Sequence, residues 1–283
     1  MYNDFLIRCL MTVLLFFSYA NGKDQQKIFR ISEGTSMFMP AVEENGQSHR
    51  YDFIGDCVIT SISNGPTGVK LGYNGTPSYA GVITKQPIDN KPFRIDIRFI
   101  ISKGTKGDGL AFWLTSSNEF KKGNLYGREP VDGLLLAIDL KGNTPFIGIN
   151  YKNTERISSF HKTEQLKGNI FDNQLSLRIL YENESIVVSI GRNNNFTDVF
   201  QIDDYTLPEQ SYFAISTKHT TGFSPTTLFA IRQSNIEYPS FKPSLEKERP
   251  SKRGWVWAIF IIGLVVLVVT VGKKQFDNFK KNN

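Results

Sequence analysis

Asp108 is the residue whose setting first suggests chemistry in this sequence. It stands between Gly107 and Gly109, directly before the apolar run LAFWLT. The two glycines permit backbone angles that other residues avoid, and a carboxylate is a strong acceptor for hydroxyl donors. An ionised carboxylate beside a buried strand is costly unless a partner compensates its charge. Asp108 therefore either caps its own turn or reaches a ligand.

A second group of oxygen-bearing side chains follows the apolar run GLLLAIDL at residues 133–140. Asp139 and Asn143 lie on either side of Lys141. An acid and an amide in one loop can supply oxygen ligands to a calcium ion. The lysine opposes such binding, because an ammonium 4 Å from the ion costs roughly 4 kcal/mol per unit charge at intermediate dielectric. Its long stem also allows the ammonium to turn away from the loop.

The sequence shows no catalytic arrangement. Glycan hydrolases built on β-sandwiches need two carboxylates across the scissile bond, whereas the strand-like stretch RIDIR, residues 94–98, offers a single acid. No Ser-His-Asp or Cys-His set has a recognisable context, and His49 and His219 are assigned surface or core roles. We therefore predict that the protein is not an enzyme. The net charge of +6 is spread along the chain, and no basic cluster with interleaved aromatics indicates nucleic acid.

The elements that must position these residues have the patterns of β-strands. The stretch FRIDIRFIIS, residues 93–102, places Phe93, Ile95 and Ile97 on one face and charged residues on the other, which is the period of a half-buried strand. LSLRILY and SIVVSI flank a turn at residues 182–184 and predict a hairpin. GLLLAIDL suits a strand covered on both faces, and YFAIST and TTLFAIRQ predict late strands. The fold class that follows is an all-β antiparallel sandwich at residues 23–238.

The two ends of the chain have the features of a single-pass type I membrane protein. Residues 1–22 combine Arg8, a short apolar run and small residues at a cleavage position, which indicates a signal peptide; an uncleaved anchor helix is the alternative. Residues 254–272 are uncharged and long enough to span a bilayer, with Trp255 and Trp257 at one end. A Pro- and Lys-rich stalk occupies residues 239–253, and residues 273–283 form a cytosolic tail.

Further features agree with a lumenal domain of the secretory pathway. The mature chain keeps Cys57 as its single cysteine, so no internal disulfide is expected. Three N-glycosylation sequons begin at Asn74, Asn183 and Asn195. The chain ends in Lys280-Lys281-Asn282-Asn283, which resembles the dilysine signal by which vesicle coat proteins return type I membrane proteins to the endoplasmic reticulum. A basic flank of the membrane span is the alternative.

Several stretches together resemble the L-type (legume-like) lectins of the early secretory pathway. The resemblance extends over about three-quarters of the chain. It is carried by YAGVITKQPI (79–88), FRIDIRFIISKGTKGDGLAFWLT (93–115), GLLLAIDLKGN (133–143) and, more faintly, YFAISTKHTTG (212–222). The resemblance implies a legume-lectin jelly roll, and its short stalk is similar to that of the family's small members. It implies that Asp108 accepts hydrogen bonds from mannose hydroxyls, that Asn143 and the loop ending at Gly222 face the glycan, and that Asp139 and Asn143 hold calcium.

The sequence departs from the family pattern downstream of this loop. The family places a histidine for sugar and a further aspartate for calcium there. Residues 150–164 contain no Asp, and their single histidine is His161, which we retain as a candidate sugar contact. With Lys141 in the loop, we expect calcium to bind weakly or not at all and the ammonium to pair with Asp139.

The resemblance implies a lectin-like membrane cargo receptor that binds high-mannose glycoproteins and cycles between the endoplasmic reticulum, its intermediate compartment and the Golgi. The alternative is a protein-binding trafficking adaptor on the same fold that has lost calcium-dependent sugar binding. In either case we expect Asp108 and Asn143 on adjacent loops at one end of a sheet, with Asp139 behind them and residues 220–222 opposite.

Overall fold

The computed structural model describes residues 27–32, 36–37, 48–61, 67–73, 75, 77–88, 92–104, 107–151, 159–193, 195–220, 222 and 224–238. The predicted signal peptide, stalk, membrane span, cytosolic tail and the Asn74 sequon lie outside these residues. Within them, no helix is long and apolar enough to cross a membrane. The chain divides into two compact units, residues 1–238 and 239–283, and all strands belong to the first.

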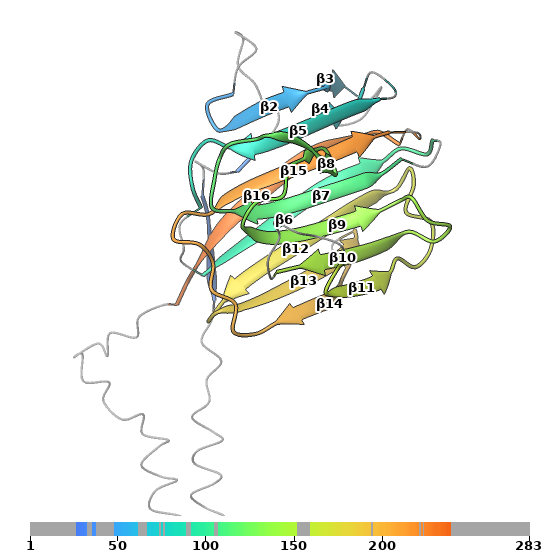
Figure 1. Ribbon diagram of the computed structural model, residues 1–283. Helices are drawn as coiled ribbons and strands as arrows, with labels where there is room; N and C mark the ends of the chain where they lie inside the picture. The colour runs from blue at the N-terminus through green and yellow to red at the C-terminus, as the bar shows by residue number, and fades with distance from the viewer. Residues whose placement is uncertain are drawn as a thin grey trace, which may run out of the picture. The chain divides into compact units, whose positions relative to one another are not determined.

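Eight strands form one antiparallel sheet, which we call sheet A (Figure 1). Its order is β14-β13-β12-β6-β16-β4-β3, and β1 pairs with β16. The bounds are β1 (Ile28–Ile31), β3 (Cys57–Ser61), β4 (Thr67–Leu71), β6 (Phe93–Ile101), β12 (Gln174–Glu182), β13 (Ser185–Arg192), β14 (Asn195–Ile202) and β16 (Thr226–Glu237).

Seven strands form the second antiparallel sheet, sheet B, in the order β11-β10-β9-β7-β15-β5-β2. The bounds are β2 (Tyr51–Gly55), β5 (Ser78–Thr84), β7 (Gly109–Thr115), β9 (Gly133–Asp139), β10 (Phe146–Asn150), β11 (Lys162–Gln165) and β15 (Tyr212–His219). The short β8 (Lys122–Leu125) belongs to neither sheet order. The predicted strands and the 182–184 hairpin turn are all present.

The two sheets pack face to face around one hydrophobic core. Phe93, Ile95 and Ile97 of β6 are at most 1% exposed and lie in this core, together with Phe112 of β7 and Leu136 of β9. The strand alternation predicted this inner face, and the antiparallel sandwich is confirmed. At about 25 cal/mol per Å² of apolar surface, burial of these side chains is the main force that holds the sheets together.

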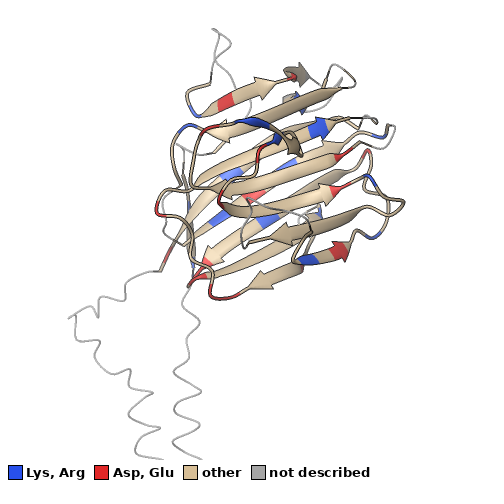
Figure 2. Cartoon of the chain, viewed as in Figure 1, with Lys and Arg blue, Asp and Glu red and all other residues tan. Residues whose placement is uncertain are grey.

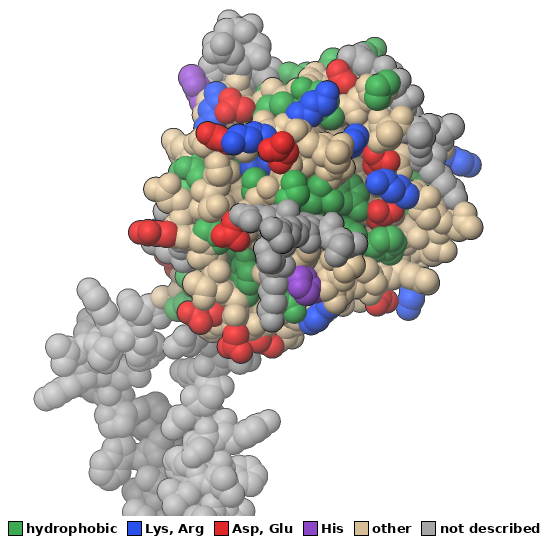
Figure 3. Space-filling model, in the orientation of Figure 1, with side chains coloured by type: hydrophobic (Ala, Val, Ile, Leu, Met, Phe, Trp, Pro, Cys, Tyr) green, Lys and Arg blue, Asp and Glu red, His purple; other side chains and the backbone are tan. Residues whose placement is uncertain are grey.

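The outer face of sheet B is also covered by the chain. Trp113, Leu135 and Ala137 are buried in a second cluster on that side, where the ring of Phe120 packs against Gly81 and that of Phe160 against Gly148. Hydrophobic side chains gather in the middle of this face (Figure 3). This cover explains why the segments that form β7 and β9 are almost continuously apolar instead of alternating.

The outer face of sheet A is charged. Asp96 of β6 accepts a hydrogen bond from Nε of Arg178 at 2.7 Å and forms an ion pair with Arg94, with 3.0 Å between Oδ2 and Nε. Figure 2 marks the positions of basic residues along the strands in blue. The guanidinium of Arg178 also stacks 3.9 Å from the centre of the Phe196 ring. Residues 94, 96 and 98 are therefore the solvent side of the half-buried strand that their alternation predicted.

Candidate functional site

Three connections between strands meet at one end of sheet B. Gly109, the first residue of β7, pairs with Asp139, the last residue of β9. On its other side Gly109 pairs with Lys218 near the end of β15. The residue before Gly109, the loop after Asp139 and the segment after β15 are consequently neighbours in space. Leu140 N–H also donates to the Asp108 carbonyl at 3.4 Å, which joins the first two connections directly.

Asp108 is buried at this junction, with 7% of the residue exposed. Thr220 Oγ1 donates to its Oδ2 at 2.6 Å, and the ammonium of Lys141 lies 3.8 Å from its Oδ1. Gly109 follows with φ at 129°, a backbone conformation that glycine tolerates. Asp108 therefore reaches partners on two other connections and does more than cap its own turn. Its carboxylate does not face open solvent.

Asp139, which pairs with Gly109 across the sheet, has different partners from Asp108. Its Oδ2 accepts from the hydroxyl of Tyr126 at 2.7 Å, and its Oδ1 accepts from the backbone N–H of Lys141 at 2.9 Å. Burial, together with the hydrogen bond to Asp139, raises the pKa of Tyr126, so the phenol stays a donor. The sequence predicted that the Lys141 ammonium pairs with Asp139. That prediction is wrong, because the ammonium pairs with Asp108 and only the Lys141 backbone reaches Asp139.

His219 packs behind the Asp108 connection. It is 1% exposed, and its imidazole fills the space in which a side chain at Gly107 or Gly72 would lie. Desolvation lowers the pKa of His219, and the negative charge of Asp108 opposes this effect. Of the two roles that the sequence left open for His219, surface or core, the core role is therefore the correct one. Gly107 must lack a side chain because the imidazole of His219 approaches it closely.

The structure brings some of the other predicted residues to this junction and leaves one away from it. Asn143 is exposed in the connection from β9 to β10, and Gly222 is buried just beyond Thr220. His161 is not brought to the site. Its N–H donates to the Ile149 carbonyl at 2.9 Å at the far end of β10, whose other end pairs with Asp139. The ring of His161 instead lies 4.9 Å from that of Tyr151.

The side chains at this junction do not fit a calcium ion. Calcium takes six to eight oxygen ligands, mainly from carboxylates, carbonyls and water. Both oxygens of Asp139 accept hydrogen bonds within the protein, and the cation nearest to Asp108 among the described residues is that of Lys141. Among the described residues, no three His, Cys, Asp or Glu side chains form a group that could hold a metal ion.

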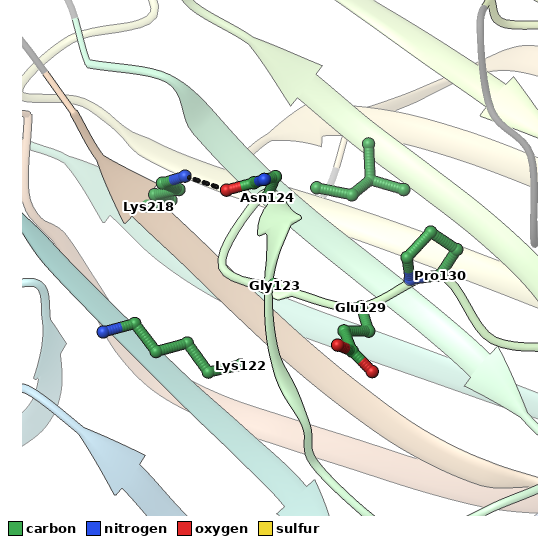
Figure 4. Close-up of a pocket in the computed structure, with 7 residues that line it drawn as sticks. Lys122, Gly123, Asn124, Glu129, Pro130 and Lys218 are labelled. Atoms are coloured by element: carbon green, nitrogen blue, oxygen red, sulfur yellow. Dashed lines mark hydrogen bonds between the residues drawn. The ribbon is translucent and has the colours of Figure 1, made fainter.

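A polar hollow of about 780 Å³ borders the junction on the outer face of sheet B. It is lined by Lys122, Gly123, Asn124, Leu125, Glu129, Pro130 and Lys218. Figure 4 shows Lys218 and Asn124 facing each other, joined by the hydrogen bond from Nζ to Oδ1 at 2.8 Å. The hollow contains neither Asp108 nor Asn143, so it is a neighbour of the predicted site and not the site itself.

Two contributors to the junction were missed from the sequence. The hydroxyl of Thr220 was placed only within a loop opposite the site, and Tyr126 was not considered. Tyr126 precedes Gly127 in the turn after β8 and has φ at 48°. No spacing in the sequence links Tyr126 to Asp139, since the contact depends on how the 116–132 segment crosses the outer face of sheet B.

Two of the three predicted glycosylation sites can be located. Asn183 is exposed in the turn between β12 and β13, and Asn195 is exposed at the first position of β14. Both positions leave room for a bulky, solvated glycan.

The fold is thus an antiparallel β-sandwich of two sheets, with a carboxylate held among the connections at one end of sheet B. The legume-like lectin family profile matches residues 31–240, and the chain belongs to that family. A search of curated proteins found no match.

Solved structures show the same fold. The lumenal domain of VIP36 in its calcium-bound form has a TM-score of 0.62 at 17% identity, covering 74% of this chain and 93% of that one. A legume lectin-like domain from Entamoeba histolytica has a TM-score of 0.60 at 21% identity, covering 73% and 99%. The carbohydrate recognition domain of Emp46p in a metal-free form has a TM-score of 0.57 at 16% identity, covering 72% and 97%.

Proposed function

We propose that this protein is a membrane-anchored, lectin-type cargo receptor. In this proposal it binds high-mannose N-glycans of cargo glycoproteins and cycles between the endoplasmic reticulum and the Golgi. The observation that carries the proposal is the Asp108 carboxylate, which is held by Thr220 at the end of sheet B where three connections meet. A carboxylate has about four lone-pair directions, so Asp108 keeps acceptor capacity for a sugar hydroxyl.

The surrounding groups have matching chemistry. The amide of Asn143, exposed in the connection that follows Asp139, can donate to one hydroxyl and accept from another. The backbone of Gly222 can approach a sugar ring closely, because glycine has no side chain. VIP36 supports the ligand class, since its lumenal domain was solved with mannose and with Man3GlcNAc. The proposed sugar-binding residues are therefore Asp108, Thr220, Asn143 and Gly222. His161 is left out because it lies away from the junction.

The membrane and trafficking parts of the proposal rest on the two ends of the sequence. The apolar segment 254–272 would anchor the domain as a type I protein, and Lys280 and Lys281 would bind vesicle coat proteins from the cytosolic side. Glycosylation at Asn183 and Asn195, both exposed, agrees with a lumenal location.

The test is a glycan array probed with the purified full chain, once with calcium and once with a chelator. Binding of high-mannose glycans, lost in Asp108→Ala, is the expected result. An array on which no glycan binds in either condition would reject sugar recognition.

A second candidate function is a protein-binding trafficking adaptor on the same fold. It is favoured by the fact that both Asp108 oxygens already have partners inside the protein, so the site needs no ligand to satisfy its buried carboxylate. A chain that shows no sugar binding on the array but still cycles between the two compartments would support this second function.

A further inference from the structure

Lys141 is the residue at which this site departs most from a calcium-binding loop. Its ammonium lies 3.8 Å from Oδ1 of Asp108, whose side chain is 9% exposed, whereas the Lys141 side chain itself is 59% exposed. The lysine therefore reaches from solvent onto a largely buried carboxylate. A buried carboxylate requires a compensating positive charge or hydrogen bonds, and Lys141 supplies the charge while Thr220 supplies the hydrogen bond.

The same lysine organises the second carboxylate through its backbone. The N–H of Lys141 donates to Asp139 Oδ1, and the hydroxyl of Tyr126 donates to Oδ2. The Lys141 ammonium also lies 6.0 Å from the centre of the Tyr126 ring, at the outer limit of a cation–π contact. One residue thus contacts both acids of the junction, and each carboxylate oxygen of the two acids has a partner inside the protein.

The charges at the junction also argue against a bound calcium ion. The Lys141 ammonium pairs with one of the two carboxylates, that of Asp108, and no group of three His, Cys, Asp or Glu side chains among the described residues could hold a metal ion. A calcium ion placed between the carboxylates would be repelled by the Lys141 ammonium and would have to break the hydrogen bonds to Asp139.

We propose that the Lys141 ammonium is the resident cation of this site and replaces calcium there. The sugar consequence rests on the function proposed above: any glycan bound at Asp108 is bound in a calcium-independent manner. The ammonium would then act as both counter-ion to Asp108 and donor to a sugar hydroxyl, because only one side of its three-proton head faces the carboxylate.

Charge reversal at this position provides the test. The full chain is purified in detergent as wild type, as Lys141→Glu and as the control Lys70→Glu. Lys70 lies on sheet A, where its ammonium faces the Tyr73 ring. The probe is calcium chloride alone, read out by the thermal unfolding midpoint and by titration calorimetry. Lys141→Glu is expected to gain calcium affinity at least tenfold over wild type and to unfold at a higher temperature with calcium than with chelator. In wild type and in Lys70→Glu, calcium should neither raise the unfolding temperature nor produce a binding signal in calorimetry.

A second variant covers the case in which Lys141→Glu fails to fold. Lys141→Gln removes the charge without adding a carboxylate, and it should bind calcium more tightly than wild type. Micromolar calcium binding by wild type, or equal calcium affinity in wild type and the folded variants, would overturn the proposal.

The calcium measurements separate this inference from the proposed function. If calcium behaves as expected but wild type binds no glycan on the array, the sugar function fails and the role of Lys141 stands. If wild type binds glycans only when calcium is present, the role of Lys141 fails and the sugar function stands.

Discussion

Thr220 donates its hydroxyl to Oδ2 of Asp108 at 2.6 Å, although 112 positions separate the two residues in the sequence. The contact joins the segment after β15 to the connection before β7 and limits the rotation of the carboxylate. Binding energy at such a site depends on acceptors that are already oriented, because a sugar then does not have to order them on arrival.

The Asp108 carboxylate is expected to be required for sugar binding and to contribute to stability. Asp108→Asn should reduce high-mannose binding below detection. Because the residue is buried and accepts a hydrogen bond in its charged form, we expect the free energy of unfolding to fall by about 1–3 kcal/mol. Glycan arrays and urea unfolding measure the two effects. Unchanged glycan affinity in the folded variant would show that the sugar site lies elsewhere.

The Thr220 hydroxyl is expected to act by positioning Asp108. Thr220→Val keeps the side-chain shape and removes the donor, which should weaken glycan binding by roughly tenfold, equivalent to about 1.4 kcal/mol. Thr220→Ser, which keeps the hydroxyl, should restore most of the affinity. Equal loss in both variants would indicate a steric effect instead of a hydrogen bond.

Two neighbours on β6 provide a test of the sandwich. Ile97 is 0% exposed in the core, so Ile97→Ala should lower the free energy of unfolding by about 2–5 kcal/mol. Arg98 lies on the opposite, exposed face of the same strand, and Arg98→Ala should change it by no more than about 0.5 kcal/mol. Similar losses in chemical denaturation for both variants would contradict the assignment of inner and outer faces.

His219 should make the domain sensitive to acid. Desolvation lowers its pKa in the folded state, whereas histidine in an unfolded chain titrates near pH ~6.5. Below that pH the unfolded chain binds a proton that the folded chain does not. The free energy of unfolding therefore rises with pH in that window and falls on acidification. Urea unfolding between about pH 5 and 7 should show a smaller slope for His219→Gln. An equal slope in wild type and His219→Gln would contradict this role of His219.

The C-terminal lysine pair should determine where the protein resides. Changing Lys280 and Lys281 to Ser is expected to release the protein to the cell surface, because the coat-binding cations would be absent. Surface biotinylation measures the change. The same substitution at Lys273 and Lys274, which flank the predicted span, should leave the protein inside the cell. A wild-type distribution of the Lys280 and Lys281 variant would refute the retrieval signal.

The sequence by itself determined the strands and singled out Asp108 as a candidate site residue. Alternation at residues 93–101 assigned an inner and an outer face to β6, because successive side chains of a strand point to opposite sides. The almost continuous apolar run at 133–139 indicated a strand buried on both faces, and the second cluster around Trp113 is the cover it required. Asp108 was identified by its flanking glycines, which are local features of the chain.

The tertiary structure alone decided which groups meet at the site. The Lys141 ammonium was expected on Asp139 but lies on Asp108, and Asp139 instead accepts hydrogen bonds from Tyr126 and from the backbone N–H of Lys141. His161 was expected near the sugar but lies at the far end of β10, because the pairing of β10 with β9 and β11 places it there. Alternation along one strand specifies only which side a residue faces. The partners of that residue depend on the register between strands distant in the sequence, which is set when the two sheets pack.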